Sequence, residues 1–385
     1  MKCYLVTGAA GFIGANFVKY LIETYGNDVR IVILDALTYA GHLESIKDEI
    51  ALPNVTFIKG DIGDFNLVSA IIKEHKPDYV VNFAAESHVD RSITGPRIFV
   101  ETNILGTQTL LDAVREAWRC PDNSYLPGHR FLQISTDEVY GALTIDFTSP
   151  QPLQMNAEVS RVCSHRGNPE TFGNALFNEH TPLSPRSPYS ASKASADMLV
   201  MAYHETFGLP VSITRCSNNY GPYQFTEKLI PLIITNILKG KKLPVYGKGE
   251  NVRDWLYVTD HARAIDLVLT KGKQGEVYNI GGLNEKQNIS IVREIIATVS
   301  RLIAENPDYR HLSVLPAEDI NESLIEFVTD RPGHDLRYAI DPTKIAGELG
   351  WVPQTPFSEG IRLTVKWYLD NPGWIESVTS KTSES

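Results

Sequence analysis

The chain has 385 residues, 43% of them hydrophobic and 21% charged, which suits one large domain or two fused domains with packed cores. Its formal net charge of −10 argues against nucleic acid or a membrane surface as the main partner, because both attract basic proteins. No apolar run approaches the roughly 18 residues that span a bilayer, and the start turns glycine-rich too early for a signal peptide. We therefore expect a cytoplasmic protein.

Strand-like and helix-like patterns alternate through the first half of the chain. Short apolar runs are typical of buried strands, and apolar residues spaced three or four apart are typical of helices. Strands are predicted at 3–6, 30–34, 55–58, 79–83, 131–134 and 211–215, and helices at 10–24, 67–74, 98–118 and 188–207. This alternation predicts an α/β fold with a doubly wound parallel sheet.

From about residue 219 the alternation stops. We predict a first domain over 1–218 with the sheet and most of the catalytic residues, and a smaller mixed α/β subdomain over 219–376 that mainly serves to bind the substrate. The polar segment 377–385 is expected to be a disordered tail. The long irregular stretch 142–185 is predicted to be a surface insertion, over the active site or between subunits.

The four cysteines, Cys3, Cys120, Cys163 and Cys216, are widely scattered. No pair has the spacing of a metal site or a redox motif, and the polar side chains around Cys163 also lack metal spacing. We therefore expect reduced cysteines and no bound metal.

A glycine-rich turn, Gly8-Ala9-Ala10-Gly11-Phe12-Ile13-Gly14, follows the first predicted strand and begins the first predicted helix. In this context the glycines allow a tight turn and close approach to a pyrophosphate, which binds at the helix N-terminus. Asp35 ends the second strand, where a carboxylate can bind both ribose hydroxyls of NAD and repel the 2′-phosphate of NADP. The sequence thus predicts a Rossmann-type sheet with NAD as cofactor.

Two further groups of residues are typical of acid–base chemistry. Thr136, Asp137 and Glu138 follow the strand at 131–134, and open α/β sheets place their chemistry at such strand ends. Tyr189 and Lys193 are four apart on a predicted helix and therefore share one face. We expect the Lys193 ammonium and a cationic nicotinamide ring to stabilise a Tyr189 phenolate, which could then act as a base.

These motifs resemble the extended short-chain dehydrogenase/reductase superfamily, through the glycine turn and Tyr189-x-x-x-Lys193. Within it, Thr136-Asp137-Glu138-Val139-Tyr140-Gly141 is similar to the dTDP-glucose 4,6-dehydratase family, whereas the related epimerases usually lack the Asp-Glu pair. The resemblance covers nearly the whole chain apart from the insertion and the tail. It continues through 84–90, 218–224, 228–231, 246–249, 253–255 and 330–335.

The resemblance implies an NAD-dependent hydro-lyase that converts dTDP-glucose to dTDP-4-dehydro-6-deoxy-glucose and water. Tyr189 would take the C4 hydroxyl proton while hydride moves to NAD⁺, and Thr136 would bond the same oxygen. Glu138 would then remove the C5 proton, and a protonated Asp137 would protonate the departing C6 hydroxyl. Hydride would return to C6. This division requires the pKa of Asp137 to rise far above its usual value.

The resemblance also implies binding residues. The expected cofactor contacts are Gly8, Gly11, Phe12, Ile13, Gly14, Asp35, Leu37, Thr38, Asp61, Ile62, Phe83, Ala84, Ala85, Ser87, Thr102, Tyr189, Lys193 and Asn219. The expected substrate contacts are Ser87, Thr136, Asn218, Lys228, Leu229, Pro244, Tyr246, Arg253, Asn288, Arg331 and His334, with Arg253 and Arg331 as candidates for the diphosphate.

Two alternatives remain open at this point. One is a 4,6-dehydratase or 4-epimerase of another nucleotide sugar, and the other is a non-catalytic NAD-binding protein. The intact set of Thr136, Asp137, Glu138, Tyr189 and Lys193 favours catalysis. Members of the superfamily usually pair through two long helices of each subunit, so we expect a homodimer formed through 98–118 and 188–207.

Overall fold

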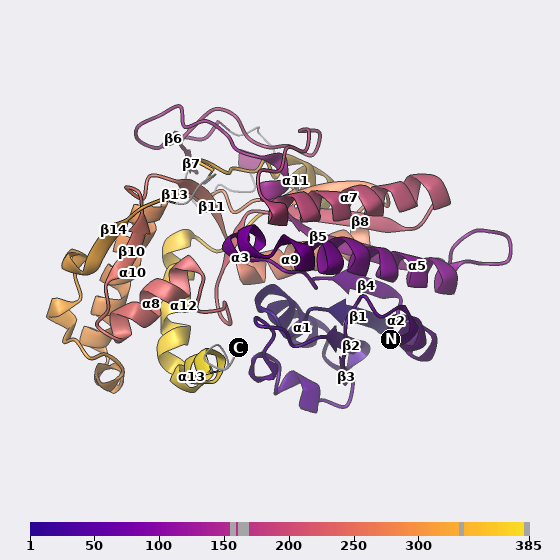
Figure 1. Cartoon of the computed structure of the whole chain (residues 1–385), viewed down its shortest axis with the longest axis horizontal. Helices are drawn as coiled ribbons and strands as arrows, with labels where there is room; N and C mark the ends of the chain where they lie inside the picture. The colour runs from indigo at the N-terminus through magenta and orange to yellow at the C-terminus, as the bar shows by residue number, and fades with distance from the viewer. Residues whose placement is uncertain (155–158, 161–168, 331–334, 381–385) are drawn as a thin grey trace.

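The computed structural model describes residues 1–154, 159–160, 169–330 and 335–380. Its centre is a seven-stranded sheet in the order β12-β8-β5-β4-β1-β2-β3, in which every neighbouring pair is parallel (Figure 1). The strands are β1 (Lys2–Thr7), β2 (Val29–Asp35), β3 (Val55–Lys59), β4 (Tyr79–Asn82), β5 (Arg130–Thr136), β8 (Val211–Cys216) and β12 (Glu276–Ile280). The predicted doubly wound parallel sheet is thus confirmed.

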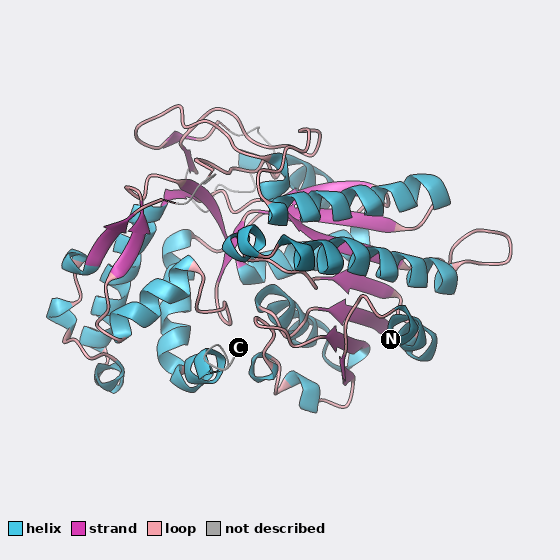
Figure 2. Ribbon diagram, viewed as in Figure 1, coloured by secondary structure: helices cyan, strands magenta, loops and turns pink. Residues whose placement is uncertain are grey.

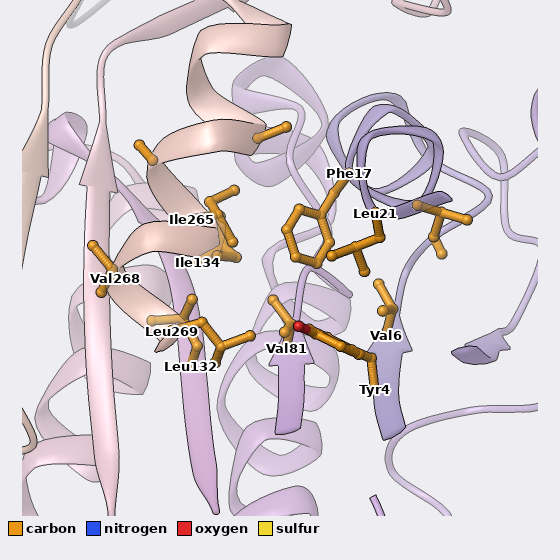
Figure 3. Packing of buried hydrophobic residues seen from close by; sticks show 14 of the residues in the cluster. Tyr4, Val6, Phe17, Leu21, Val81, Leu132, Ile134, Ile265, Val268 and Leu269 are labelled. Atoms are coloured by element: carbon orange, nitrogen blue, oxygen red, sulfur yellow. The ribbon is translucent and has the colours of Figure 1, made fainter. Parts of the chain in front are cut away.

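Helices cover both faces of the sheet (Figure 2). On one face lie α1 (Phe12–Tyr25) and α9 (Val258–Lys271), whose buried side chains, Phe17 and Ile265 among them, pack on the strands (Figure 3). The other face is covered by α2 (Phe65–His75), α5 (Thr107–Trp118) and α7 (Pro188–Phe207). Because both faces are buried, the strands are continuous apolar runs and do not alternate.

The helix predicted at 98–118 is a single helical run in three parts. It consists of α4 (Pro96–Phe99), a π-helical segment η4 (Val100–Gly106) and α5. The short helix α3 (Val89–Thr94) precedes it. A π-helical turn inside a longer helix is rare and is frequent at functional sites, and here Thr102 of η4 reaches the cavity described below.

The predicted domain boundary at residue 218 is wrong in one respect. The chain leaves the sheet after β8 but returns to it with α9 and β12, which pairs with β8 from Glu276 to Ile280. The stretch 258–280 therefore belongs to the first domain and not to the smaller subdomain. Its buried residues Ile265 and Val268 complete the core on the α1 side. The sequence pattern of this stretch does not indicate that it packs on the sheet beside α1.

The smaller subdomain has its own core. It contains β9 (Asn218–Tyr220), β10 (Leu243–Tyr246), β11 (Val252–Tyr257), β13 (Glu285–Gln287) and β14 (Ile325–Val328), with α8 (Leu229–Leu238), α10 (Asn288–Glu305), α12 (Phe357–Asp370) and α13 (Pro372–Ser380). Helix α11 (Thr343–Leu349) packs against β12. The predicted tail is partly wrong, because α13 includes 377–380 and Val378 is fully buried.

The segment 142–185 is only partly a surface insertion. Its described residues include the antiparallel pair β6 (Gln151–Pro152) and β7 (Glu170–Thr171), and the side chains of Phe172 and Phe177 are buried. Residues 155–158 and 161–168, with Cys163, lie outside the described residues. The insertion is anchored at its second half, since Phe177 N donates to Ala339 O.

Arg337 is the centre of this anchor. Its guanidinium makes a two-pronged pair with Glu285, with Nε and Nη2 each 2.8 Å from a carboxylate oxygen, and both side chains are buried. Nη1 donates to Ala175 O at 2.8 Å, and Nη2 donates to Thr171 Oγ1 at 2.9 Å. The buried pair thereby joins the insertion to the smaller subdomain.

Across the described ranges, each helix is too short or too polar to cross a membrane.

Candidate active site

A deep cavity lies at the carboxyl ends of the central strands, between the large sheet and the N-terminus of α8. Loops after β1, β2, β4, β5 and β8 all contribute to its lining, because parallel strands end at the same edge of the sheet. The cavity brings together the glycine turn, the strand end at Thr136 and the Tyr189–Lys193 pair. Three motifs that are distant in the sequence thus form one site.

The glycine turn allows a close approach that no other residue would permit. Gly8 has a φ of +69°, and a Cβ there would lie 2.6 Å from Ala84 N of the neighbouring loop. A Cβ on Gly14 would lie 2.5 Å from Gly8 O, so α1 could not pack so closely on the turn. Gly11 caps α1 without a side-chain hydrogen bond. The first N–H groups of the helix therefore remain for an anionic group.

Asp35 ties the second strand to this turn. One carboxylate oxygen accepts from Ala10 N and the other from Leu37 N, each at 2.8 Å. Burial raises the pKa of Asp35, whereas these two backbone hydrogen bonds lower it. Each oxygen keeps a further lone pair for a ribose hydroxyl. The turn, the open helix end and this carboxylate fit a dinucleotide without a 2′-phosphate.

The strand end at β5 continues into a short 3₁₀ turn, η5 (Asp137–Tyr140). Thr136 caps this turn, since its Oγ1 accepts from Glu138 N at 3.3 Å and also bonds Asp137 Oδ1 at 3.2 Å. Asp137 is only 2% exposed. Its Oδ2 is buried with no hydrogen-bond partner in the described part of the chain. A buried carboxyl oxygen without a partner is costly in the charged form.

Burial is the main cause that raises the pKa of Asp137 well above its usual range. The negative charges of Glu138 and Asp254 raise it further, whereas Arg253 opposes them. Asp254 is itself buried and fixed by the N–H groups of Gly282 and Asn284, each at 2.7 Å. Burial and the two neighbouring carboxylates therefore favour the protonated form of Asp137, which is the form that an acid needs.

Tyr189 and Lys193 lie on α7 and face the same cavity. Lys193 is buried and its Nζ donates to Ile134 O of β5 at 2.7 Å. Burial is the largest cause that raises the pKa of Tyr189, and the negative charge of Glu138 adds to it. The negative charge beside the ring therefore opposes the predicted phenolate, which needs a nearby positive charge to form.

Most of the predicted cofactor residues line the cavity, and Leu37 is the exception in the described part of the chain. Leu37 acts through its backbone, which bonds Asp35. The Asn219 side chain is held by His261 Nδ1 at 2.9 Å and Ser217 O at 2.9 Å. Residues that line the cavity and were missed by the sequence reasoning include Tyr39, Cys216, Gln224, Phe225 and Glu227.

The predicted substrate residues divide into two groups. Ser87, Thr136, Asn218 and Lys228 line the cavity, whereas the described lining does not contain Leu229, Pro244, Tyr246, Arg253 or Asn288. Arg331 and His334 lie outside the described residues.

The Arg253 guanidinium bonds to groups of its own subdomain. Its guanidinium donates to Val252 O at 2.8 Å and Asp335 O at 2.9 Å, and it stacks over the Tyr338 ring at 4.3 Å. Its charge nevertheless acts on Asp137. In this conformation three of the five guanidinium N–H donors bond backbone carbonyl oxygens of Val252, Asp335 and Leu336.

The position of Cys216 could have been found from the sequence. It ends the strand β8, which was predicted at 211–215, and strand ends at this edge of the sheet reach the cavity. Tyr39, Phe225 and Glu227 carry no such local signal, because they come from loops whose positions depend on the smaller subdomain.

Residues 4–281 match the family described as NAD dependent epimerase/dehydratase. A dTDP-glucose 4,6-dehydratase of Xanthomonas campestris pv. campestris (strain B100) is 50% identical over 380 residues, which cover 98% of this chain and 96% of the relative. The dTDP-glucose 4,6-dehydratase 1 of Escherichia coli (strain K12) is 49% identical over 381 residues, 99% of this chain and 96% of the relative.

A solved structure is also similar. The dTDP-glucose 4,6-dehydratase of Streptomyces venezuelae, with NAD and TYD bound, has a TM-score of 0.80 and 41% identity, over 98% of this chain and 99% of that one. The similarity includes both the sheet and the smaller subdomain, since it extends over nearly the whole length of both chains. The chain therefore belongs to the NAD dependent epimerase/dehydratase family, on the branch of the dTDP-glucose 4,6-dehydratases.

Proposed function

We propose that this chain converts dTDP-glucose to dTDP-4-dehydro-6-deoxy-glucose and water. The observation that carries the proposal is the buried Asp137, whose pKa is raised, next to Glu138 in the cavity that also contains Thr136 and Tyr189. A dehydratase needs an acid and a base on adjacent groups, and separated pKa values provide them. An epimerase or a binding protein has no use for the second carboxyl.

The first part of the proposed reaction is the oxidation of C4. The glycine turn and Asp35 would hold NAD, which would supply the hydride acceptor for C4 and the hydride donor for C6. Tyr189 takes the proton of the C4 hydroxyl, and the Thr136 hydroxyl bonds the same oxygen. Both side chains line the cavity with Lys193 behind them. Their fixed positions on α7 and β5 hold the reacting oxygen in one place.

The second part is the loss of water. Once C4 is a carbonyl, the C5 proton is acidic, and Glu138 removes it. Asp137 then gives its proton to the departing C6 hydroxyl, which leaves as water. After C6 has received the hydride, the proton held on Glu138 returns to C5. Asn218 and Lys228 are proposed to hold the nucleotide sugar at the cavity mouth, where Lys228 Nζ donates to Ser87 O at 3.2 Å.

The test is incubation of the protein and NAD with dTDP-glucose that carries deuterium at C4, followed by mass spectrometry and NMR. The expected product has lost one water and carries the deuterium at C6. Parallel reactions with UDP-glucose and GDP-mannose test the nucleotide. A product of unchanged mass indicates a 4-epimerase, and conversion of another nucleotide sugar alone overturns the substrate. No reaction with any of them indicates a binding protein.

We further propose that two copies of the chain pair through the α7 and η4 face. Met198 is 59% exposed and Leu105 of η4 is 51% exposed. On α7, Ala191 and Ala202 are exposed as well and lie on the face of Met198 by helical spacing. Exposed apolar side chains that share one face of a helix are typical of an interaction site.

Met198→Glu is expected to convert the dimer into a monomer, because a charge in an apolar interface lacks a partner. Sedimentation velocity at several concentrations measures the change. The matched control is Val314→Glu, which also places a charge on an exposed apolar residue, 72% exposed, but on the smaller subdomain. Dimers in both variants, or a monomeric unsubstituted protein, would refute the proposed interface.

A further inference from the structure

Three acid–base side chains form one row on α7. Tyr189, Lys193 and Asp197 are each four residues apart, so they lie on the same face of the helix. This face packs on β5: Lys193 Nζ donates to Ile134 O at 2.7 Å, and Ser135 Oγ donates to Asp197 Oδ2 at 3.0 Å. The row thus runs from the cavity, at Tyr189, into the core, at Asp197.

Asp197 is the buried end of the row, with 1% of its surface exposed. Arg215 of β8 donates from Nε to Asp197 Oδ2 at 2.9 Å and from Nη1 to the Tyr140 hydroxyl at 3.0 Å. Asp197 Oδ1 has no hydrogen-bond partner among the described residues. Only the Oδ2 atom of the Asp197 carboxylate therefore bonds Arg215. The function proposed above assigns no role to Asp197.

Lys193 needs an opposite charge nearby. It is 4% exposed, and its one described hydrogen bond is to a neutral carbonyl. Burial lowers the pKa of Lys193, and the largest effect that opposes this change is the negative charge of Asp197. In return, Arg215 and Lys193 oppose the rise that burial causes in the pKa of Asp197. A buried cation without such a counter-charge loses its proton.

We propose that Asp197 is a positioning residue for the oxidation of C4, whose fixed negative charge keeps the Lys193 side chain an ammonium next to Tyr189. This inference rests on the proposed function. Among the protein groups around the Tyr189 phenol, the charge of Glu138 opposes its ionisation and the Thr136 hydroxyl favours it, so the Lys193 ammonium adds the positive charge.

The charged groups around the row are few and come from defined elements. On α7 they are Lys193 and Asp197 with the phenol of Tyr189, and on β8 they are Arg215 and the Cys216 thiol. The turn η5 contributes Asp137 and Glu138, which act on Tyr189. The packed strand β5 and the segment η4 contribute neutral groups, Ser135 and the Asn103 amide, which donates to Ser192 Oγ at 2.8 Å.

The test compares Asp197→Asn with the unsubstituted protein over a pH series, by single-turnover formation of reduced nicotinamide from dTDP-glucose. Lys193 should lose its proton at lower pH in the variant. In the variant, the fall of the oxidation rate at alkaline pH, the alkaline limb, is therefore expected to begin about one to three pH units lower. The oxidation rate at acidic pH should change little. A profile of unchanged shape overturns the inference, whatever the overall rate.

Asp266→Asn is the matched control. Asp266 is also buried and also has one oxygen without a described partner, but it bonds Tyr25 on α1, away from Lys193. Its profile should keep the alkaline limb of the unsubstituted protein. Thermal unfolding of each variant, with NAD bound, shows whether the fold is retained.

Arg215→Lys separates charge from structure, because it keeps a cation beside Asp197 but removes the Nη1 hydrogen bond to the Tyr140 hydroxyl. If Asp197 acts on Lys193 by its charge, this variant keeps the alkaline limb of the unsubstituted protein. If Asp197 only holds Arg215, Arg215→Lys and Asp197→Asn move the limb down together, which overturns the inference. This variant also decides the case if Asp197→Asn does not fold. An unsubstituted protein that never oxidises dTDP-glucose refutes the proposed function instead.

Discussion

Asp137→Asn is expected to leave the oxidation of C4 within a few-fold of its normal rate while slowing the loss of water by about 10²–10⁴-fold, the usual contribution of a positioned acid. The amide has the size of the carboxyl group and occupies the same buried site, but it has no proton to transfer. Rapid-quench single turnovers should therefore show reduced nicotinamide that accumulates and dehydrated sugar that lags.

The control for this variant is Glu138→Gln, which removes the proposed base and leaves the acid. It is expected to block exchange of the C5 proton with solvent deuterium, whereas Asp137→Asn should permit that exchange. The pKa of Asp137 is raised, so the elimination rate of the unsubstituted protein should fall as the pH rises through that pKa and the acid loses its proton. Equal loss of oxidation and elimination in Asp137→Asn would contradict the assigned role.

Arg337→Met is expected to lower the free energy of local opening of the insertion by about 3–5 kcal/mol, the usual effect of removing one partner of a buried ion pair. Arg337 is fully buried, and its loss leaves the Glu285 carboxylate in the interior with Thr171 Oγ1 and Phe172 N as its remaining donors. Hydrogen exchange of the peptide that contains Phe172 and Phe177 measures the free energy of local opening.

An exposed ion pair provides the comparison. Arg293 Nε lies 3.0 Å from Glu322, with 53% and 61% of the two side chains exposed, so Arg293→Met should change stability by about 0–1 kcal/mol. In the double variant Arg337→Met with Glu285→Leu, no buried charge is left alone, and part of the loss should be recovered. Similar effects of Arg337→Met and Arg293→Met would show that the buried pair is not the anchor.

The most reliable predictions from sequence concern elements whose signals are local. Helix α7 was predicted at 188–207 and is found there. Ser187 and Ser190 cap its start reciprocally, Pro188 occupies its first turn, and Gly208 ends it in a left-handed conformation. The parallel strands were equally clear, because burial on both faces makes each of them a continuous apolar run.

The errors concern contacts between distant segments. The return of α9 and β12 to the large sheet depends on a pairing between Glu276 and Ser212 that nothing in either stretch specifies. The buried side of the insertion likewise depends on Arg337, which follows it by more than 150 residues. Such partners are chosen by the shape of the assembled core and cannot be read from a local pattern.

The sequence by itself determined which chemical groups the site contains, since the glycine turn, Asp35, the Thr136 strand end and Tyr189 with Lys193 are each compact local motifs. Only the tertiary structure decided the surroundings that set their pKa values. Burial, Glu138 and Asp254 raise the pKa of Asp137, and Asp254 lies on β11 of the smaller subdomain. A pKa depends on solvent exclusion and on charges within a few ångströms, and both exist only once distant segments have packed together.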